Sequence, residues 1–164
     1  MNTIVLNNLQ IEQKIQRIAY EILEHHFESK RIHLIGIHGN GFLLAERLAA
    51  VLKEIAPQEL IVGQIKINKT DPFADPIEVS VPIDNLDSDT VILVDDVINS
   101  GRTMQYALAK LLEEPIYRIK TAALVDRKHR RFPIRCDYIG LTLSTTLQDR
   151  VEVDLNREAK AYLV

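Results

Sequence analysis

The sequence predicts an α/β fold in which helices flank a central, mainly parallel sheet. Strand-like and helix-like segments alternate over residues 32–125, an order that places parallel strands in one sheet with right-handed crossovers. Residues 90–94 are almost continuously apolar, which is typical of a strand covered on both faces. The chain has 164 residues, 46% hydrophobic and 26% charged, which is enough for one globular domain with its own core.

The first predicted element is an amphipathic helix that ends near Phe27, with Asn7 or Asn8 as the expected N-cap. Isoleucines recur at spacings of four, three and four, which places them on one helical face. They are Ile11, Ile15, Ile18 and Ile22. His25 and His26 are neighbours at the end of this helix, so their side chains point in different directions. We expect both to be surface residues that bind no metal.

A strand over residues 32–37 and a second helix follow, joined by the glycine-rich turn His38-Gly39-Asn40-Gly41. Apolar residues at helical spacing mark the buried face of this helix. They are Leu44, Leu48, Leu52 and Ile55. His33, inside the strand, is expected to be packed. The turn is spaced Gly-x-x-Gly-x-Gly, unlike the Gly-x-Gly-x-x-Gly of dinucleotide sites, so a dinucleotide site is disfavoured.

Residues 60–82 interrupt the alternation. Two extended pieces, 61–67 and 77–81, flank the polar segment Asn68-Lys69-Thr70-Asp71-Pro72, whose composition suits a mobile loop. We therefore expect a small flap, or hood, at about residues 61–82.

The rest of the chain resumes the α/β pattern. After the apolar strand we expect a helix over 102–112, ended by Pro115, and a strand over 119–125. A basic stretch and two short strands, 138–140 and 151–153, complete the chain. There is no internal repeat and no linker, so residues 1–164 are expected to form a single domain.

Charge and cysteine content limit the classes of function. Lys+Arg 20 against Asp+Glu 23 gives a net charge of -3, so any nucleic-acid site would be a local patch. Cys136 is the single cysteine and cannot form an internal disulfide. Residues 1–6 lack the pattern of a signal peptide, and no apolar run approaches the ~18 residues of a membrane span. We expect a cytoplasmic protein without a membrane partner.

The segment VILVDDVINSGRTM carries the clearest chemical pattern. Asp95 and Asp96 stand at the carboxyl end of a buried strand, the edge where ligands bind in open parallel sheets. The turn after them suits a phosphate, because Gly101 lets N–H groups point inward and Ser100 and Thr103 add hydroxyls at a helix N-terminus. Two carboxylates would repel a phosphate, so their expected task is to hold vicinal hydroxyls or a divalent cation. A ribose phosphate meets both requirements.

This segment resembles the 5-phosphoribosyl 1-diphosphate (PRPP) motif of the type I phosphoribosyltransferases, in which two acids contact the ribose hydroxyls and the next loop binds the 5′-phosphate. The resemblance spans most of the chain and is strongest to the pyrimidine operon regulator (PyrR) family, bifunctional proteins with uracil phosphoribosyltransferase activity. It rests on GIHGNGFLLAERLA (36–49), VILVDDVINSGRT (91–103) and ALVDRKHRRFPIRCDYIG (123–140). It implies the type I phosphoribosyltransferase fold, transfer of phosphoribose from PRPP to a nucleobase, in the first place uracil, Mg²⁺ as cofactor, and a homo-oligomer.

The resemblance also implies residue roles. Asp95 and Asp96 would be the catalytic pair, holding the ribose and, through PRPP and water, Mg²⁺. The other residues form four groups. These are the PRPP loop (Val97, Asn99, Ser100, Gly101, Arg102 and Thr103), the pyrophosphate loop (His38, Gly39 and Asn40), the flap (Lys66 and Lys69) and the base side (Val125, Asp126, Arg127, Tyr138 and Ile139).

Two features bear on the substrate and the rate. Similar enzymes that use 6-oxopurines carry aspartate where this chain has Asn99; an amide cannot take the purine proton, so a pyrimidine is favoured. The family generally has Thr-Arg in the pyrophosphate loop and Tyr-Arg-Asp in the flap, where this chain reads Gly39-Asn40 and Lys69-Thr70-Asp71 in a shorter flap. Without these arginines, leaving-group stabilisation is expected to weaken by roughly a few kcal/mol. Lys66, Lys69 or His38 would have to compensate.

An alternative from another class stays open: a nucleotide-sensing, RNA-binding regulator of pyrimidine genes with weak or no catalysis. It rests on a dense local basic patch that aligns with the family's basic segment. The negative net charge and the lack of interleaved aromatic residues weigh against it. The patch comprises Arg127, Lys128, His129, Arg130, Arg131 and Arg135, which Arg17 on the first helix could join.

Overall fold

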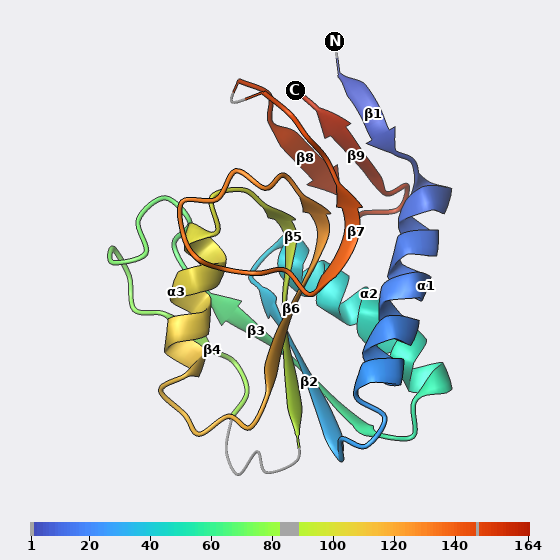
Figure 1. Cartoon of the computed structure of the whole chain (residues 1–164), viewed down its shortest axis with the longest axis vertical. Helices are drawn as coiled ribbons and strands as arrows, with labels where there is room; N and C mark the ends of the chain where they lie inside the picture. The colour runs from blue at the N-terminus through green and yellow to red at the C-terminus, as the bar shows by residue number, and fades with distance from the viewer. Residues whose placement is uncertain (1, 83–88, 147) are drawn as a thin grey trace.

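The fold is a mixed six-stranded sheet with helices on both faces (Figure 1). The structure, a computed structural model, describes residues 2–82, 89–146 and 148–164, so Met1 of the chain start discussed above lies outside it. The strand order is β4-β3-β2-β5-β6-β7, and only β4 runs antiparallel to its neighbour. The strands of this main sheet are β2 (Arg31–Ile37), β3 (Glu59–Lys66), β4 (Glu78–Val79), β5 (Thr90–Ile98), β6 (Ile119–Asp126) and β7 (Tyr138–Thr142).

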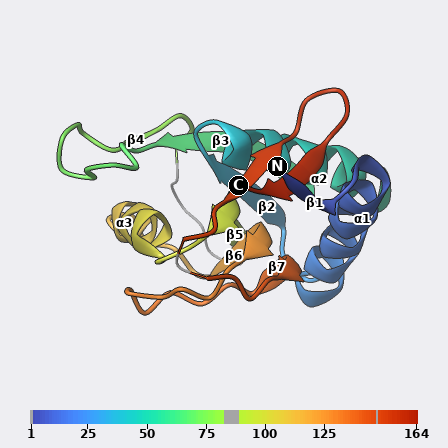
Figure 2. The same ribbon diagram turned by 90° about the horizontal axis from the view of Figure 1, so that it is seen from above.

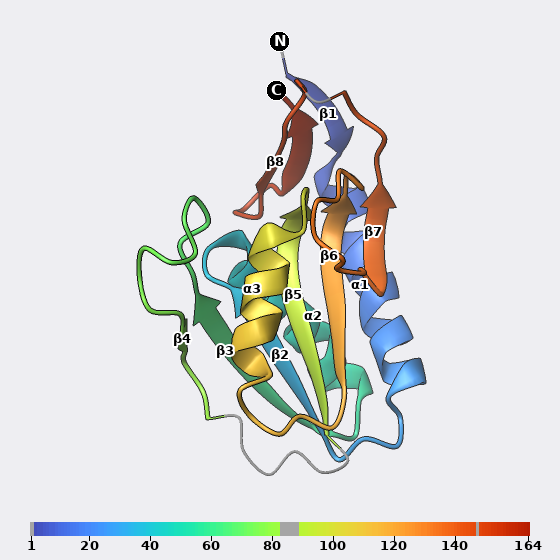
Figure 3. The same ribbon diagram turned by 60° about the vertical axis from the view of Figure 1, so that its left-hand side comes forward.

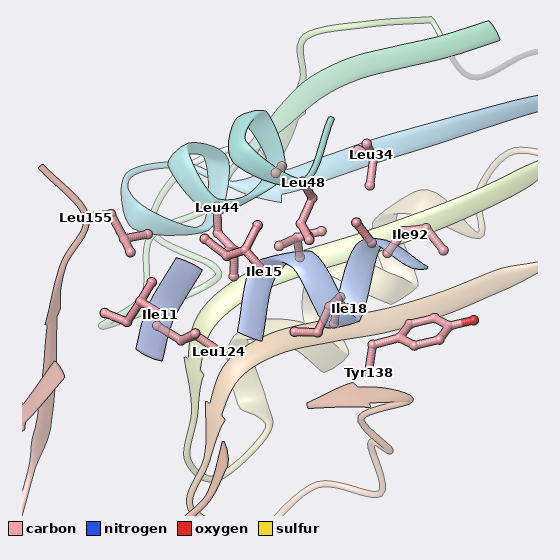
Figure 4. Close-up of a cluster of buried hydrophobic side chains, with 14 of the residues drawn as sticks. Ile11, Ile15, Ile18, Leu34, Leu44, Leu48, Ile92, Leu124, Tyr138 and Leu155 are labelled. Carbon is pink, nitrogen blue, oxygen red and sulfur yellow. The ribbon is translucent and has the colours of Figure 1, made fainter. Parts of the chain in front are cut away.

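Two layers of helices enclose the sheet. Helices α1 (Asn8–His25) and α2 (Asn40–Ile55) cover one face, and α3 (Arg102–Leu111) covers the other (Figures 2 and 3). The larger hydrophobic cluster lies under α1 and α2, where their isoleucines and leucines meet those of the strands (Figure 4). A second cluster lies between the sheet and α3. In the described residues, no helix combines the length and the apolar character that a membrane span requires.

Local signals explain why the helices start where they do. Asn7 caps α1 as expected: its side chain accepts from the Gln10 amide at 2.9 Å, while the Gln10 side chain accepts from the Asn7 amide at 2.9 Å. This reciprocal capping box satisfies two amides that the helix itself cannot. In contrast, α2 and α3 follow Gly39 and Gly101 and have no side-chain cap. The first N–H groups of α2 are therefore open to a ligand, as are those of α3 after the Arg102 amide, which donates to the Ser100 hydroxyl at 3.3 Å.

The central strand β5 is longer than the sequence indicated. It pairs in parallel with β2 and with β6, and the β6 pairing extends to Ile98 opposite Asp126. Asp95 and Asp96 therefore belong to the strand, and pairing with β6 holds their backbone in place. The carboxyl ends of β2, β5 and β6 meet at one edge of the sheet, and the predicted phosphate loop starts from this edge.

A second, antiparallel sheet rises above this edge (Figure 3). We call it the hood sheet; it consists of β1 (Thr3–Leu6), β9 (Lys160–Leu163) and β8 (Val151–Asp154), in that order. Only β8 was expected from the sequence. The prediction that residues 61–82 form the hood is corrected: β3 belongs to the main sheet, and only the β3–β4 connection projects as a flap.

The two histidines at the end of α1 differ from each other. His25 is exposed as expected, whereas the surface prediction for His26 is wrong, because His26 is 2% exposed. The Tyr138 hydroxyl lies 2.7 Å from His26 Nε2 and 3.0 Å from His25 Nδ1. Burial and the nearby Arg118 lower the pKa of His26 to about 4, so it is neutral at physiological pH. His33 is buried, as predicted.

Candidate active site

The acid pair at the end of β5 is held by its own backbone. Asp95 Oδ1 accepts from the Asp96 amide at 2.9 Å, and Asp96 Oδ1 accepts from the Val97 amide at 2.8 Å. The start of α2 packs directly against this pair: a Cβ on Gly41 would lie 2.8 Å from the Val94 carbonyl and 3.0 Å from Asp95 Oδ1. Only glycine leaves room for this approach, which brings α2 beside the carboxylates.

The loop after the acids presents its amides on one side. The Asn99 carbonyl accepts from Arg130 Nη1 at 3.0 Å, and the Ser100 carbonyl accepts from the amides of Arg131 and Phe132 at 2.9 and 3.1 Å. Because the C=O and N–H of a trans peptide point in opposite directions, the N–H groups of Ser100 and Gly101 face away from this support. With the uncapped start of α3, they form a nest of donors suited to a phosphate.

Gly101 is the residue that makes this loop geometry feasible. Its φ of +85° lies in the left-handed region, where side chains are strained. A Cβ at this position would also lie 2.3 Å from Ile134 Cγ2. The loop therefore needs glycine for its conformation and for its packing on the basic segment.

A cavity of about 240 Å³ lies between the acids and this loop and is lined by Lys69, Asp95 and residues 97–104. The structure thus brings together the predicted PRPP loop, one of the two acids and one flap lysine. Asp96 does not line the cavity, but it lies next to Lys69, which does. The Nζ atom of Lys69 is 3.3 Å from Asp95 Oδ1 and 4.0 Å from Asp96 Oδ1. Lys69 is the cation nearest to the acid pair in the described part of the chain.

The flap is seated on the first turn of α3. Arg102 Nη2 donates to the carbonyls of Lys69 and Thr70, both at 2.8 Å. The Phe73 ring meets Tyr106 of α3 edge to face, with centroids 5.3 Å apart. Lys66 behaves differently from Lys69, because it ends β3 and lines a separate cavity of about 400 Å³ together with His38. Only one of the two flap lysines therefore reaches the acids.

The electrostatics of the pocket favour a cation. Burial, and next the adjacent Asp96, raise the pKa of Asp95 to about 8, while Lys69 opposes the shift. In the ligand-free pocket Asp95 therefore holds a proton near neutral pH. A cation placed beside the pair would favour the ionised form of Asp95.

Two carboxylates alone do not make a metal site. No group of three or more His, Cys, Asp or Glu side chains suited to a metal occurs within residues 2–82, 89–146 and 148–164. Mg²⁺ typically uses one or two carboxylates, together with water and substrate phosphates. The donor set of Asp95 and Asp96 therefore fits a Mg²⁺ ion that arrives on a diphosphate and does not fit one held by the protein alone.

The predicted pyrophosphate loop lies at the junction of β2 and α2. Asn40 Nδ2 donates to the Val153 carbonyl of the hood sheet at 2.7 Å and to Asp96 Oδ2 at 3.3 Å. The Asn40 amide thus links the acid pair to the hood sheet. His38 is exposed, and its Nδ1 lies 2.9 Å from Gln64 Oε1. Neither side chain supplies a fixed positive charge next to the acids.

On the base side, several expectations need correction. Val125 and Tyr138 belong to the core cluster under α1 and α2, and the Tyr138 hydroxyl is used by the histidines of α1. Asp126 is buried and pairs with Arg130 Nη2 at 2.9 Å. Ile139 packs against the cluster on the α3 side. None of these four residues lines the cavity beside the acids, because each is used by the core or by the basic segment.

Arg127, the fifth residue of the base side, connects two loops at the edge of the cavity. Its guanidinium donates to Asn99 Oδ1 at 2.9 Å and to the Thr145 hydroxyl and the carbonyls of Thr146 and Asp149. The sequence prediction missed these three partners, Thr145, Thr146 and Asp149. They are polar and follow no recognised motif, so the signal lies only in their long-range contacts with Arg127.

The basic segment divides into internal and exposed residues. Arg127 is buried, and Arg130 donates to the carbonyls of Asn99 and Ile134. His129 Nε2 lies 3.0 Å from the Thr145 carbonyl. The exposed cations are Lys128, Arg131 and Arg135. The first group of the expected RNA patch therefore makes contacts inside the protein, around the phosphate loop. Only the three exposed cations remain available to a partner such as RNA. Arg17 is tied by its guanidinium to the carbonyls of Ile139 and Gly140.

Comparisons with known proteins agree with this geometry. The family model described as "Phosphoribosyl transferase domain" matches residues 1–155. The structure resembles the hypoxanthine phosphoribosyltransferase of Trypanosoma cruzi with a TM-score of 0.75 at 16% identity, covering 98% of this chain and 95% of that one. A hypoxanthine-guanine phosphoribosyltransferase from Bacillus anthracis gives a TM-score of 0.67 at 17% identity, covering 86% and 82%. The chain is thus a phosphoribosyltransferase domain, and the predicted α/β class and type I phosphoribosyltransferase fold are confirmed.

The proteins with similar sequences define a narrower family within the phosphoribosyltransferases. A "Bifunctional protein PyrR" from Deinococcus deserti is 40% identical over 161 residues, covering 93% of this chain and 87% of that protein. A protein of the same name from Streptomyces coelicolor is 38% identical over 161 residues, covering 94% and 83%. The chain belongs to the PyrR family, as its motifs indicated.

Proposed function

We propose that this protein transfers the 5-phosphoribosyl group of PRPP to uracil, giving UMP and pyrophosphate. The observation that carries the proposal is the placement of the Asp95–Asp96 pair beside the amide nest of residues 100–103, around one cavity. The two halves of that cavity match the two halves of a ribose phosphate: the nest suits the 5′-phosphate and the acids suit the ribose hydroxyls. PRPP carries both groups, and membership of the PyrR family supports uracil as acceptor.

The chain's own groups act by binding and orientation. The open amides of the α3 N-terminus hold the 5′-phosphate, while the carboxylates of Asp95 and Asp96 accept hydrogen bonds from the ribose hydroxyls and favour positive charge on the sugar as the leaving group departs. Mg²⁺ held by Asp95 and Asp96 through PRPP would neutralise the diphosphate. No covalent nucleophile is needed, because uracil N1 attacks C1 of the ribose directly. The N1–C1 bond forms as the C1–O bond to the diphosphate breaks, pyrophosphate leaves, and the N1 proton passes to water.

Lys69 is the residue that changes partner in this mechanism. In the ligand-free pocket its ammonium pairs with the ribose acids. Ribose and Mg²⁺ bound beside the acids would displace this ammonium. Lys69 would then be free to supply the positive charge that arginine provides elsewhere in the family.

The proposal also covers the setting of the reaction. It places the whole chain in one domain, in the cytoplasm and in a homo-oligomer, with PRPP and a nucleobase as small-molecule partners. Size-exclusion chromatography with light scattering tests the oligomer, and limited proteolysis that yields no stable fragment supports a single domain.

The central test is pyrophosphate release from PRPP and Mg²⁺ with each of six bases: uracil, cytosine, hypoxanthine, guanine, adenine and orotate. We expect release with uracil alone. The matched control is the double variant Asp95→Asn/Asp96→Asn, which keeps the shape of the pair, removes its charge and should abolish release. Release with a purine would contradict the pyrimidine assignment, and no release with any base would contradict the enzymatic proposal.

A second candidate function, RNA binding with nucleotide sensing, is supported by one further observation. The sequence showed no aromatic residues interleaved with the basic patch, but in the structure Phe132 lies next to Tyr106, with ring centroids 6.0 Å apart, beside the exposed Arg131. Aromatic rings beside cations are typical of surfaces that bind single-stranded nucleic acid. Fluorescence anisotropy with a pyrimidine-leader RNA, at 50 and 200 mM salt, tests it. An absence of salt-dependent binding would exclude this function.

A further inference from the structure

Arg127 carries a buried positive charge that only neutral groups hold. The residue is 7% exposed. Nη1 donates to Asn99 Oδ1 at 2.9 Å, and Nε and Nη2 donate to the Thr145 hydroxyl at 2.9 and 2.8 Å. Nη2 also reaches the carbonyls of Thr146 and Asp149. None of the described carboxylates is within ion-pair distance of it. The Asp149 carboxylate interacts electrostatically with Arg127 but does not pair with it directly. A buried charge without a direct counter-charge is costly, so stability alone does not explain this arrangement.

The contact with Asn99 determines which end of the Asn99 amide faces the ligand. A guanidinium can only donate hydrogen bonds, so the end that faces Arg127 is the carbonyl oxygen Oδ1. The orientation of an asparagine amide is otherwise ambiguous, and here the hydrogen-bond network settles it. Nδ2 has no partner among the described residues, and Asn99 lines the cavity beside the acids. The NH₂ group is therefore what Asn99 offers to a ligand.

Arg127 cannot at the same time serve an external partner. To reach a phosphate on the surface, its guanidinium would have to give up its hydrogen bonds to Asn99, Thr145, Thr146 and Asp149. The exposed cations Lys128, Arg131 and Arg135 are better placed for such a partner. The contacts of Arg127 point inward, to the two loops that border the cavity.

We propose that Arg127 is a positioning residue for the base subsite: it holds Asn99 with its NH₂ group towards the ligand and binds Thr145, Thr146 and Asp149 beside it. The subsite therefore accepts a nucleobase that offers a hydrogen-bond acceptor to this NH₂ group. The Asn99 side chain cannot remove a proton from the ring of the base. Uracil fits, because a carbonyl oxygen adjoins the nitrogen that bonds to the ribose. Uracil must also lose a proton, from N1, which can pass to solvent, because Asn99 itself is exposed. A base whose ring proton has to be taken by the side chain at position 99 does not fit. This inference rests on the proposed function, which places the nucleobase next to Asn99.

Binding calorimetry with two ligands, UMP and ribose 5-phosphate, isolates the contribution of the base. Both ligands carry the ribose phosphate, and only UMP carries a base. We expect wild-type protein to prefer UMP. In Arg127→Met and in Asn99→Ala, UMP affinity should fall up to about tenfold more than ribose 5-phosphate affinity, since one hydrogen bond to the base is lost in each. Arg157→Met, which removes an exposed arginine of the hood region, is the matched control and should leave both affinities unchanged.

The double variant Arg127→Met/Asn99→Ala distinguishes positioning from an independent contact. If Arg127 acts through Asn99, the double variant loses no more UMP affinity than either single variant. Arg127→Lys keeps the positive charge but loses the planar guanidinium. Its thermal unfolding midpoint should therefore return to that of the wild type, whereas its preference for UMP over ribose 5-phosphate should stay as low as in Arg127→Met. Asn99→Ala alters an exposed side chain and keeps the test available if Arg127→Met does not fold.

The outcomes separate the inference from the function on which it rests. Additive losses in the double variant, or equal losses for UMP and ribose 5-phosphate in Arg127→Met, would overturn the positioning role and leave the proposed function in place. A wild-type protein that binds ribose 5-phosphate but has no preference for UMP would do the same. If wild-type protein binds neither ligand, the proposed function fails and this inference fails with it.

Discussion

The two halves of the pocket are built differently. The phosphate half, residues 99–103, keeps its whole motif, and the basic segment supports its carbonyls from behind. The pyrophosphate half, at the start of α2, has the neutral Asn40 in place of a family arginine, and around Gly39 a Cβ would meet nothing within 4 Å. One half is thus tightly constrained and the other is open and weakly charged. From this difference, and on the proposed function, we expect the protein to bind ribose phosphates well and to release pyrophosphate slowly.

The largest contrast is expected from one matched pair of substitutions, Gly101→Ala and Gly39→Ala. Both glycines have a positive φ, +85° and +94°, but only at Gly101 would the new Cβ clash, at 2.3 Å from Ile134 Cγ2. Gly101→Ala should weaken ribose 5-phosphate binding about a hundredfold, because the shifted loop loses its charged hydrogen bonds. It should also lower the free energy of unfolding by about 1–3 kcal/mol.

Gly39→Ala brings the same kind of backbone strain without a clash. It should therefore change the affinity for ribose 5-phosphate by less than about tenfold. Calorimetry and chemical denaturation measure both effects. Equal effects at the two glycines would show that the phosphate half is not the more constrained one.

Restoring charge to the open half should accelerate turnover. Asn40→Arg places a guanidinium at the family position, and a charge-assisted contact of about 2 kcal/mol would raise kcat for pyrophosphate release about thirtyfold. Part of the gain is offset because the 2.7 Å bond from Asn40 to the Val153 carbonyl is lost. Asn40→Gln keeps a neutral amide and is the control. A rate in Asn40→Arg no higher than in the control would show that the missing arginine does not limit catalysis.

The raised pKa of Asp95 makes binding depend on pH. Because burial and Asp96 raise this pKa to about 8, and Mg²⁺–PRPP favours the ionised acid, affinity for Mg²⁺–PRPP should rise about tenfold between pH 7 and pH 9. The folded-state pKa lies above the unfolded value, so the stability from protonated Asp95 is complete below the unfolded value of 3.8 and is lost as pH rises through about 8.

Calorimetry and thermal unfolding between pH 6 and pH 9 measure both effects, with Asp95→Asn as the variant that removes them. In Asp95→Asn, the loss of stability towards high pH should shrink. An affinity for Mg²⁺–PRPP that does not change with pH in the wild type would contradict the assignment of this proton to Asp95.

The smallest expected effect distinguishes the two flap lysines. Lys69 lies 3.3 Å from Asp95, whereas Lys66 lines a separate cavity, so Lys69→Met should change the Michaelis constant for PRPP by about fivefold and Lys66→Met by less than twofold. The effect of Lys69 is modest because its side chain is 47% exposed and solvent screens its charge. Steady-state kinetics measures both variants. If both leave the Michaelis constant unchanged, neither lysine replaces the missing arginine.

Sequence reasoning succeeded where the signal was local. The helices, the apolar β5 and the acid pair with its glycine turn all follow from patterns within about twenty residues, and the structure places them where expected. It failed where contacts join distant segments. Strands β1 and β9 have four residues each, and they are defined by pairing with each other across almost the whole chain.

The burial of His26 and the role of Arg127 depend on equally distant partners. His26 is covered because Tyr138 of β7 lies against the end of α1. Arg127 is internal and donates to Thr145, Thr146 and Asp149. A basic run in the sequence resembles a solvent-exposed patch, and only the tertiary contacts show that part of it supports the phosphate loop.

The hood sheet joins segments that are far apart in the sequence, which imposes an order on folding. Thr3 pairs with Leu163 and Leu6 with Ala161, so during synthesis β1 cannot pair with β9 until the residues between them have been translated. The main sheet and its phosphate loop can assemble before that time. Asn40, however, makes its bond to Val153 only after β8 has been translated, and through Asn40 the hood contacts Asp96. A nascent chain therefore completes the proposed ribose phosphate pocket in two stages, and the hydrogen bond from Asn40 to the hood sheet belongs to the second.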